Sequence, residues 1–353
     1  MAEAMACSEW SRVQHLKPVG SAGHYQGFLL VEVPLPWPPD ISGIPELADL
    51  AGWAAARGIR LQAIAAGNAA APADRRPGPA RRRVVYYANP WPGWAGPLAR
   101  REAVLESGPP LEPGPLAEAV ASLVEGPGGA GPSGSTGPDR ADGPPGPAAP
   151  GVVDVLICTH GRRDLCCGSR GTELFGALSG ADGQAPPAEG TEGPGRRPPG
   201  PEVRWWRTSH TGGHRFAPTA LVLPSATLWA YADPVLLHRV VSADGPVGDV
   251  IGHYRGCATL GPPAHQALEA DVLAQVGWAL LASWRRAVDG ADGVVQLEAL
   301  AQGTWEGRVS EGRRVPAPDC RTDPADTFKY SSEWVVEGLR RVPGLAVPAP
   351  GRA

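Results

Sequence analysis

The chain has 353 residues, of which 42% are hydrophobic, and a formal net charge of −4. This length is sufficient for two modest domains with hydrophobic cores, and the charge balance gives no indication of a nucleic-acid partner. Residues 1–13 contain charges and no continuous apolar run, so we expect no secretory signal peptide and a cytoplasmic, reducing location. The longest apolar runs, such as 276–282, are much shorter than the roughly 20 residues of a membrane-spanning helix, so no membrane segment is expected.

The first part of the chain has the pattern of a small α/β domain, which we place at 1–125. Its apolar runs are interrupted by proline-rich and polar segments, as is typical of buried strands that alternate with helices. The expected elements, in order, are a strand at 27–33, a helix at 44–57, strands at 59–65 and 83–88, and a helix at 116–124.

Glycine and proline dominate two segments that contain almost no residue able to build a core. The first, 126–151, is expected to be a flexible linker between two domains. The second, 180–201, is expected to be a disordered insertion within the second domain, 152–342. The last residues, 343–353, are expected to form a frayed tail.

The second domain repeats the alternation of strands and helices. We expect strands at 152–158, 203–207, 219–223 and 227–231, and helices at 168–178 and 234–241. This order is that of a thioredoxin-like domain, so the predicted fold class is α/β with two domains. Leucines, valines and a tryptophan at four-residue spacing predict an amphipathic helix over 266–288. A C-terminal appendage of short strands is expected at 294–300, 304–309 and 327–336.

Two closely spaced pairs of soft ligands are the main chemical feature of the sequence. The first is in the run C-T-H-G-R-R-D-L-C-C, where Cys158 and Cys167 are nine positions apart, and the second is the run H-T-G-G-H, which begins at His210 and ends at His214. Thiolate and imidazole ligands converge on soft-metal centres such as iron–sulfur clusters and zinc sites. Glycines lie in both runs (Gly161, Gly168, Gly212, Gly213), and they favour loops in which backbone N–H groups approach a cluster closely.

Three alternatives remain at this point. Zinc accepts two cysteines and two histidines, but the step between the cysteines exceeds the usual two to four intervening residues. A thiol–disulfide oxidoreductase would require a C-x-x-C motif at the strand-to-helix turn, which the domain lacks. The run Cys158-Thr159-His160 is similar to the first box of a Rieske centre, but the second box is missing. The remaining cysteines, Cys7, Cys257 and Cys320, are expected to be small buried hydrophobic residues.

Three motifs in order, V-L-I-C-T-H-G-R-R-D-L-C-C-G, S-H-T-G-G-H-R-F-A-P and H-Y-R-G, resemble those of the sucrase/ferredoxin-like family. The resemblance covers most of 152–288 and implies a thioredoxin-fold ferredoxin whose first domain is degenerate. It implies a [2Fe–2S] cluster on Cys158, Cys167, His210 and His214, with Cys166 as a neighbour that is not a ligand. The residues expected to surround and support the cluster are His160, Arg163, Asp164, Gly212 and Gly213.

This resemblance implies an electron-transfer or redox protein, with coupling between electron and proton transfer through the imidazoles, rather than a substrate-converting enzyme. It also implies a redox partner protein, which the sequence does not identify. Glycoside hydrolysis would need two carboxyl groups flanking a sugar, and the sequence offers no such pair, so we do not expect a glycosidase. A zinc-stabilised thioredoxin-like interaction module is the alternative from another class.

Overall fold

The computed structural model describes residues 6–66, 81–106, 113–125, 144, 151–179, 200–320, 322 and 326–343. The predicted linker at 126–151 lies outside these residues apart from positions 144 and 151. The predicted insertion at 180–201 lies outside them apart from 200 and 201. The predicted tail lies outside them apart from residue 343.

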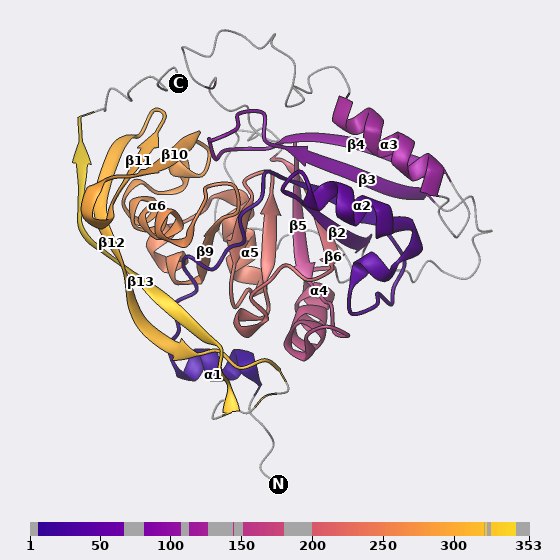
Figure 1. The fold of residues 1–353 in the computed structure, drawn as a ribbon, viewed down its shortest axis with the longest axis horizontal. Helices are drawn as coiled ribbons and strands as arrows, with labels where there is room; N and C mark the ends of the chain where they lie inside the picture. The colour runs from indigo at the N-terminus through magenta and orange to yellow at the C-terminus, as the bar shows by residue number, and fades with distance from the viewer. Residues whose placement is uncertain are drawn as a thin grey trace, which may run out of the picture.

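One large mixed sheet runs through the molecule (Figure 1). Its strands are β1 (Gly27–Glu32), β2 (Ile59–Ala66), β3 (Arg81–Ala88), β4 (Ala99–Glu106), β5 (Val152–Cys158), β6 (Glu202–Thr208), β7 (Ala220–Leu223), β8 (Thr227–Trp229) and β9 (Tyr254–Cys257). Among the described residues the spatial order is β4-β3-β1-β2-β6-β5-β7-β8-β9.

Both halves of this sheet use the same strand arrangement. In each half the first two strands are parallel neighbours, and the later strands add antiparallel on the far side of the first. Antiparallel pairing of β2 with β6, from Ile64↔Thr208 to Ala66↔Trp206, joins the halves. The two predicted regions of alternating structure therefore share one continuous sheet.

A buried carboxylate also connects the two halves. Asp154, in the middle of the otherwise apolar strand β5, has no exposed surface. It accepts hydrogen bonds from Tyr87 Oη at 2.5 Å and Trp206 Nε1 at 2.7 Å, and it pairs with Arg100 Nε at 3.1 Å. A buried charge is tolerated only when it is paired and hydrogen-bonded, so this network fixes β3 and β4 against β5.

Helices cover both faces of the sheet and shorter turns connect them. The helices are α1 (Cys7–Val13), α2 (Pro45–Ala55), α3 (Pro113–Glu125), α4 (Thr172–Ser179), α5 (Pro234–Ser242) and α6 (Pro263–Val276). The short turns are η1 (Ile41–Gly43), the π-helical turn η2 (Cys167–Gly171), η3 (His214–Phe216), η4 (Val247–Asp249), η5 (Ile251–His253), η6 (Trp278–Leu280) and η7 (Ala291–Gly293). Helices α2 and α3 bury Leu47 and Leu116 against Leu29 of β1, while α4 buries Phe175 in the core around β5.

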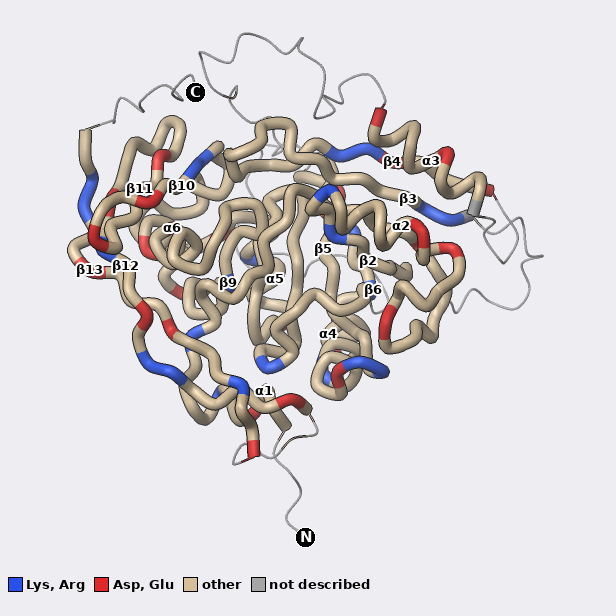
Figure 2. Tube along the Cα trace, viewed as in Figure 1, with Lys and Arg blue, Asp and Glu red and all other residues tan. Residues whose placement is uncertain are grey.

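A second, antiparallel sheet forms the C-terminal part. It consists of β10 (Arg285–Asp289), β11 (Val294–Ala299), β12 (Gly303–Pro316) and β13 (Tyr330–Val342), in that order. Charged residues of both signs lie along β12 and β13, as expected for a hairpin with a solvated face (Figure 2). Helix α1 lies beneath this hairpin (Figure 1), where Trp10 Nε1 donates to Pro316 O at 3.1 Å.

The prediction of one helix over 266–288 is wrong in its second half. Helix α6 ends at Val276, because Gly277 adopts φ 82°, a left-handed conformation that stops the helix. The following residues form η6 and then strand β10, in which Arg285 is buried and pairs with Glu269 Oε1 at 2.5 Å. The regular apolar spacing across 266–288 thus spans α6 and η6, whose buried Leu268 and Leu280 belong to the same core.

Among the helices and strands of the described residues, four were not predicted: α1, β4, β9 and β10, the last of which lies largely within the predicted helix. The other predicted strands and helices are present, most within a few residues of their expected limits, although β12 and β13 are much longer than predicted. The helices among the described residues include none that is both long and apolar enough to span a bilayer.

Candidate metal centre

Strand β5 delivers Cys158 to a tight loop that returns Cys167 to its side. Glycines make this return possible, since a Cβ on Gly168 would lie 2.4 Å from the Gly161 Cα. The chain then enters the turn η2, which begins at Cys167. Both cysteine side chains are completely buried.

The two thiols contact each other. Hydrogen bonding from Cys167 holds the pKa of the Cys158 thiol well below its usual range, and the ring of His210 acts in the same direction. The same bond, together with burial, raises the pKa of Cys167. The contact with Cys167 therefore favours the thiolate form of Cys158, which is the form that binds a metal.

The second loop lies between β6 and η3 and carries both predicted histidines. Gly213 adopts φ 69°, and a Cβ there would lie 2.5 Å from Arg255 Nη2. Arg255 is itself buried, and it donates to Gly212 O at 3.0 Å and to Ser21 O at 2.7 Å. Burial lowers the pKa of Arg255 to about 10, although the charges of Cys167 and Cys158 oppose this shift. The histidine loop is thus built against a buried guanidinium.

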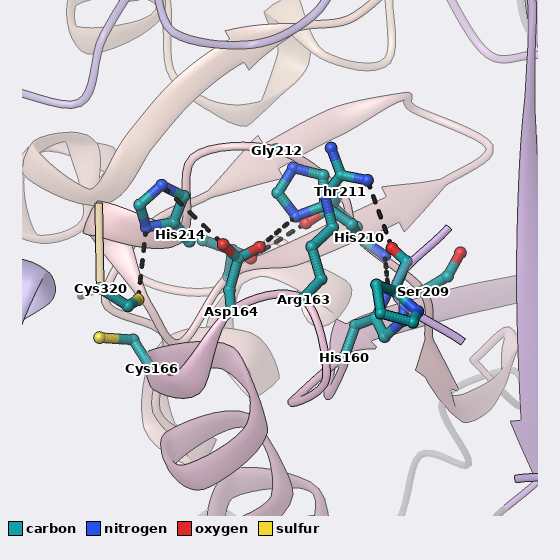
Figure 3. A network of polar contacts seen from close by, with 12 residues as sticks. His160, Arg163, Asp164, Cys166, Ser209, His210, Thr211, Gly212, His214 and Cys320 are labelled. Atoms are coloured by element: carbon teal, nitrogen blue, oxygen red, sulfur yellow. Dashed lines mark hydrogen bonds and ion pairs between the residues drawn. The ribbon is translucent and has the colours of Figure 1, made fainter. Parts of the chain in front are cut away.

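Asp164 lies between the two imidazoles, as Figure 3 shows. Its Oδ2 is 2.6 Å from His210 Nδ1, and its Oδ1 is 4.0 Å from His214 Nε2. Burial disfavours protonation of His210, but Asp164 and Cys158 outweigh that effect and raise its pKa. Burial lowers the pKa of His214 despite the nearby carboxylates. The two histidines therefore differ in their electrostatic environments.

Two of the residues expected to support the site, His160 and Arg163, lie in the first ligand loop and contact residues outside it. His160 Nε2 donates to Pro38 O at 2.7 Å, and its Nδ1 accepts the backbone N–H of His210 at 3.3 Å. Burial lowers the pKa of His160, which favours the neutral ring that this pair of bonds requires. Arg163 Nη1 reaches Pro39 O at 3.4 Å. The first ligand loop is thereby tied to the residues that precede η1.

The structure also shows a group of thiols that sequence reasoning did not find. Cys7 Sγ lies 3.3 Å from Cys166 Sγ, 3.2 Å from Cys320 Sγ and 3.1 Å from His214 Nδ1. The distance from Cys320 Sγ to His214 Nδ1 is 3.7 Å. Hydrogen bonds from Cys320 and Cys7 lower the pKa of Cys166, and the bond to Cys166 raises the pKa of Cys7. Cys7 and Cys320, which were expected only to pack, form this group with Cys166 and His214.

Three of the four predicted ligands lie close together, whereas the fourth, His214, lies between two groups. Cys158, Cys167 and the ring of His210 are in mutual contact or close to it. His214 turns Nε2 toward Asp164 but Nδ1 toward Cys7 and Cys320. Both donor groups belong to one contiguous buried cluster of sulfur-containing and small side chains. The only signal in the sequence that pointed to this second group was the adjacency of Cys166 to Cys167.

A pocket of about 490 Å³ opens beside His210. Its polar lining residues include Asp40, Arg60, His160, Arg163, Ser209 and His210. Arg60 Nη2 donates to His210 O at 2.7 Å, so the pocket wall and the histidine loop are directly connected.

Comparison with known protein families matches residues 82–256 to the sucrase/ferredoxin-like family. Comparisons with curated proteins and with solved structures found no match. The matched segment includes β5, the turn η2, both histidines and Arg255.

Proposed function

The chain belongs, through residues 82–256, to the sucrase/ferredoxin-like family, and from this premise we propose that it is an electron-transfer protein. In this proposal Cys158, Cys167, His210 and His214 hold a [2Fe–2S] cluster. The observation that carries it is the buried contact of Cys158 with both Cys167 and His210 at the end of β5. Thiolates and imidazoles are the ligand types that such clusters use.

The four proposed ligands have the chemical properties that a [2Fe–2S] cluster requires. Cys158 already has a lowered pKa, as a thiolate ligand requires. His210 Nδ1 and Asp164 Oδ2 are buried atoms 2.6 Å apart, yet neither has an aligned hydrogen-bond partner. A buried polar pair of this kind is under-satisfied, so a rearrangement on metal binding costs little.

Asp164 has a clear part in this proposal. A carboxylate on the far nitrogen of a ligating histidine fixes the tautomer and raises the basicity of the ligand. Asp164 Oδ2 is 2.6 Å from His210 Nδ1 and would take that role toward a ligating His210. Arg255 adds a buried positive charge close to Cys158 and Cys167, which stabilises thiolate.

When bound, a [2Fe–2S] cluster accepts and releases one electron at a time, and imidazole ligands raise its potential above that of an all-cysteine cluster. His210 lies in the wall of the pocket described above, so a redox partner docked there would approach a ligand rather than the buried cysteines. His210, whose pKa is raised by Asp164 and Cys158 against the effect of burial, is the ring through which we propose that electron and proton transfer are coupled.

We also propose that each half of the large sheet is a thioredoxin-like unit, with the ligands carried by the second. The support is the shared strand order, second–first–third–fourth, in β2-β1-β3-β4 and β6-β5-β7-β8. The Ala217–Pro218 peptide bond is cis and directly precedes β7, beside the histidine loop.

The test is metal analysis of the full chain purified without oxygen. We expect iron and acid-labile sulfide in equal amounts, about two of each per chain, and a red-brown colour. Cys158→Ser should abolish both. Cys257→Ser is the matched control, because Cys257 is a buried cysteine that contacts Thr259 and Ser225 instead. A colourless wild-type protein without iron would overturn the proposal.

A further inference from the structure

Three thiols and one imidazole from four parts of the chain meet beside the proposed cluster site. Cys7 begins α1, Cys166 directly precedes η2, and Cys320 lies in the connection between β12 and β13. Cys7 and Cys320 are 313 positions apart in sequence. The fourth donor is Nδ1 of His214, at the start of η3.

Three of these donor atoms, Cys7 Sγ, Cys320 Sγ and His214 Nδ1, all lie close enough together to hold one metal ion, and Cys166 Sγ is 3.3 Å from Cys7 Sγ. Zinc bonds of about 2.3 Å to sulfur and about 2.0–2.1 Å to nitrogen place tetrahedral ligand atoms roughly 3.5–3.8 Å apart. The four distances recorded here are 3.1, 3.2, 3.3 and 3.7 Å. For Cys7, Cys320 and His214 the shift to zinc distances is a few tenths of an ångström, whereas a disulfide at about 2.05 Å would require two of the sulfur atoms to approach by about 1.2 Å; Cys166 must move further to become the fourth ligand.

We propose that Cys7, Cys166, Cys320 and His214 Nδ1 form a second metal site, which binds one Zn²⁺ ion. Three thiolates and one imidazole are an established structural zinc set. The other nitrogen of His214, Nε2, lies 3.5 Å from Asp319 Oδ1 and 4.0 Å from Asp164 Oδ1 in the metal-free chain, and it is the nitrogen left for the cluster. His214 is shared with the cluster proposed above, with one ring nitrogen facing each group, whereas the three thiols have no part in that cluster.

A zinc ion at this site would connect helix α1 and the β12–β13 connection to the ligand loops. Trp10 of α1 donates to Pro316 O of β12, and Arg215 Nη2 of η3 donates to Ser331 Oγ of β13 at 3.0 Å. Structural zinc contributes directly to folding free energy. Zinc at this position would therefore fix α1 and the β12–β13 connection over His214.

The experiment measures zinc and iron in the full chain, grown with both metals and purified without oxygen. We expect one zinc per chain in the wild type and less than about a tenth in Cys7→Ser and in Cys320→Ser, with iron unchanged. Cys257→Ser should keep both metals. Zinc that is absent from the wild type, or that survives in both Cys7→Ser and Cys320→Ser, overturns the inference.

Cys158→Ser separates this inference from the proposed function. It should lose iron and keep zinc. A wild type that contains zinc but no iron, and that loses the zinc in Cys7→Ser, would support the second site and contradict the iron–sulfur cluster. If zinc disappears in Cys158→Ser but not in Cys7→Ser, the zinc occupies the predicted cluster ligands and the second site falls.

A measurement on the wild type covers the case in which a variant does not fold. Cys320 is partly exposed, so iodoacetamide should label it slowly in the zinc-loaded chain and at least tenfold faster after zinc is removed with a chelator. Equal labelling rates with and without zinc would overturn the inference.

Discussion

Replacing Gly213 by alanine should destabilise the histidine loop, because the backbone there has a positive φ and the added methyl group would displace the buried Arg255. An alanine at φ 69° costs roughly 1–2 kcal/mol relative to glycine. Its Cβ would lie 2.5 Å from Arg255 Nη2, so the buried guanidinium must move. The hydrogen bond to Gly212 O or to Ser21 O then weakens, and each is worth roughly 1.5–3 kcal/mol as a charged bond. We expect a total loss of about 3–5 kcal/mol.

The matched control is Gly248→Ala, since a Cβ at Gly248 meets no atom within 4 Å and no left-handed conformation is required. Thermal unfolding of the two metal-free variants gives the comparison, with a midpoint for Gly213→Ala roughly 6 °C or more below that of Gly248→Ala. Iron retention should fall in the same variant, because His214 is its neighbour. Midpoints within a degree of each other would refute the reasoning about Arg255.

Four further predictions follow from the same contacts. Arg255→Met should lower the midpoint potential of the cluster, because a buried positive charge favours the reduced form. An unchanged potential in a redox titration would mean that Arg255 does not lie close to the cluster. Converting His210 and His214 together to cysteine should keep the cluster but lower its potential by on the order of 100 mV or more, and no change would mean that neither is a ligand. The wild-type potential should fall as pH rises across the neutral range, whereas a constant value would argue against proton coupling. In the metal-free chain, the Asp164–His210 contact should stabilise the fold by about 1 kcal/mol more at pH 5.5 than at pH 8.5. The measurement is the difference in urea unfolding free energy between wild type and Asp164→Asn at each pH. The same difference at both pH values would contradict the prediction.

The sign of the last effect comes from the directions of the two pKa shifts. The pKa of Asp164 is lowered in the folded chain, since His210 and the other nearby cations outweigh the effect of burial, so its contribution is present above its unfolded value and is lost as pH falls through the folded value. The pKa of His210 is raised, so its contribution is complete below about pH 6.5 and is lost as pH rises through the folded value. Both contributions are therefore present near pH 5.5.

Local sequence patterns predicted the parts of the site that are local. The strand that ends at Cys158 and the glycine-containing histidine loop follow from an apolar run and from adjacent glycines, and both occur as expected. The ladder between β2 and β6 was not predictable in this way, because it pairs residues more than a hundred positions apart. Strand β4 was missed because its charged sequence, A-R-R-E-A-V-L-E, lacks the apolar character of a buried strand.

The cluster of Cys7, Cys166 and Cys320 was even less predictable from local sequence patterns. Cys7 and Cys320 are single cysteines without a nearby second ligand in the sequence, and a lone cysteine is usually a small buried hydrophobic residue. Only folding of α1 and the β12–β13 connection onto His214 gives them partners. Similarly, the four-residue apolar spacing of 266–288 could not reveal that Gly277 ends the helix within it.

The central claim is that two histidines and two cysteines hold a [2Fe–2S] cluster, and the nitrogen ligands give its most direct test. Pulsed electron paramagnetic resonance of the reduced protein, labelled with ¹⁵N-histidine, reports nitrogen atoms bound to the cluster. We expect couplings from two histidine nitrogens in the wild type and from one in His210→Cys. A reduced cluster without strong histidine nitrogen coupling would contradict it.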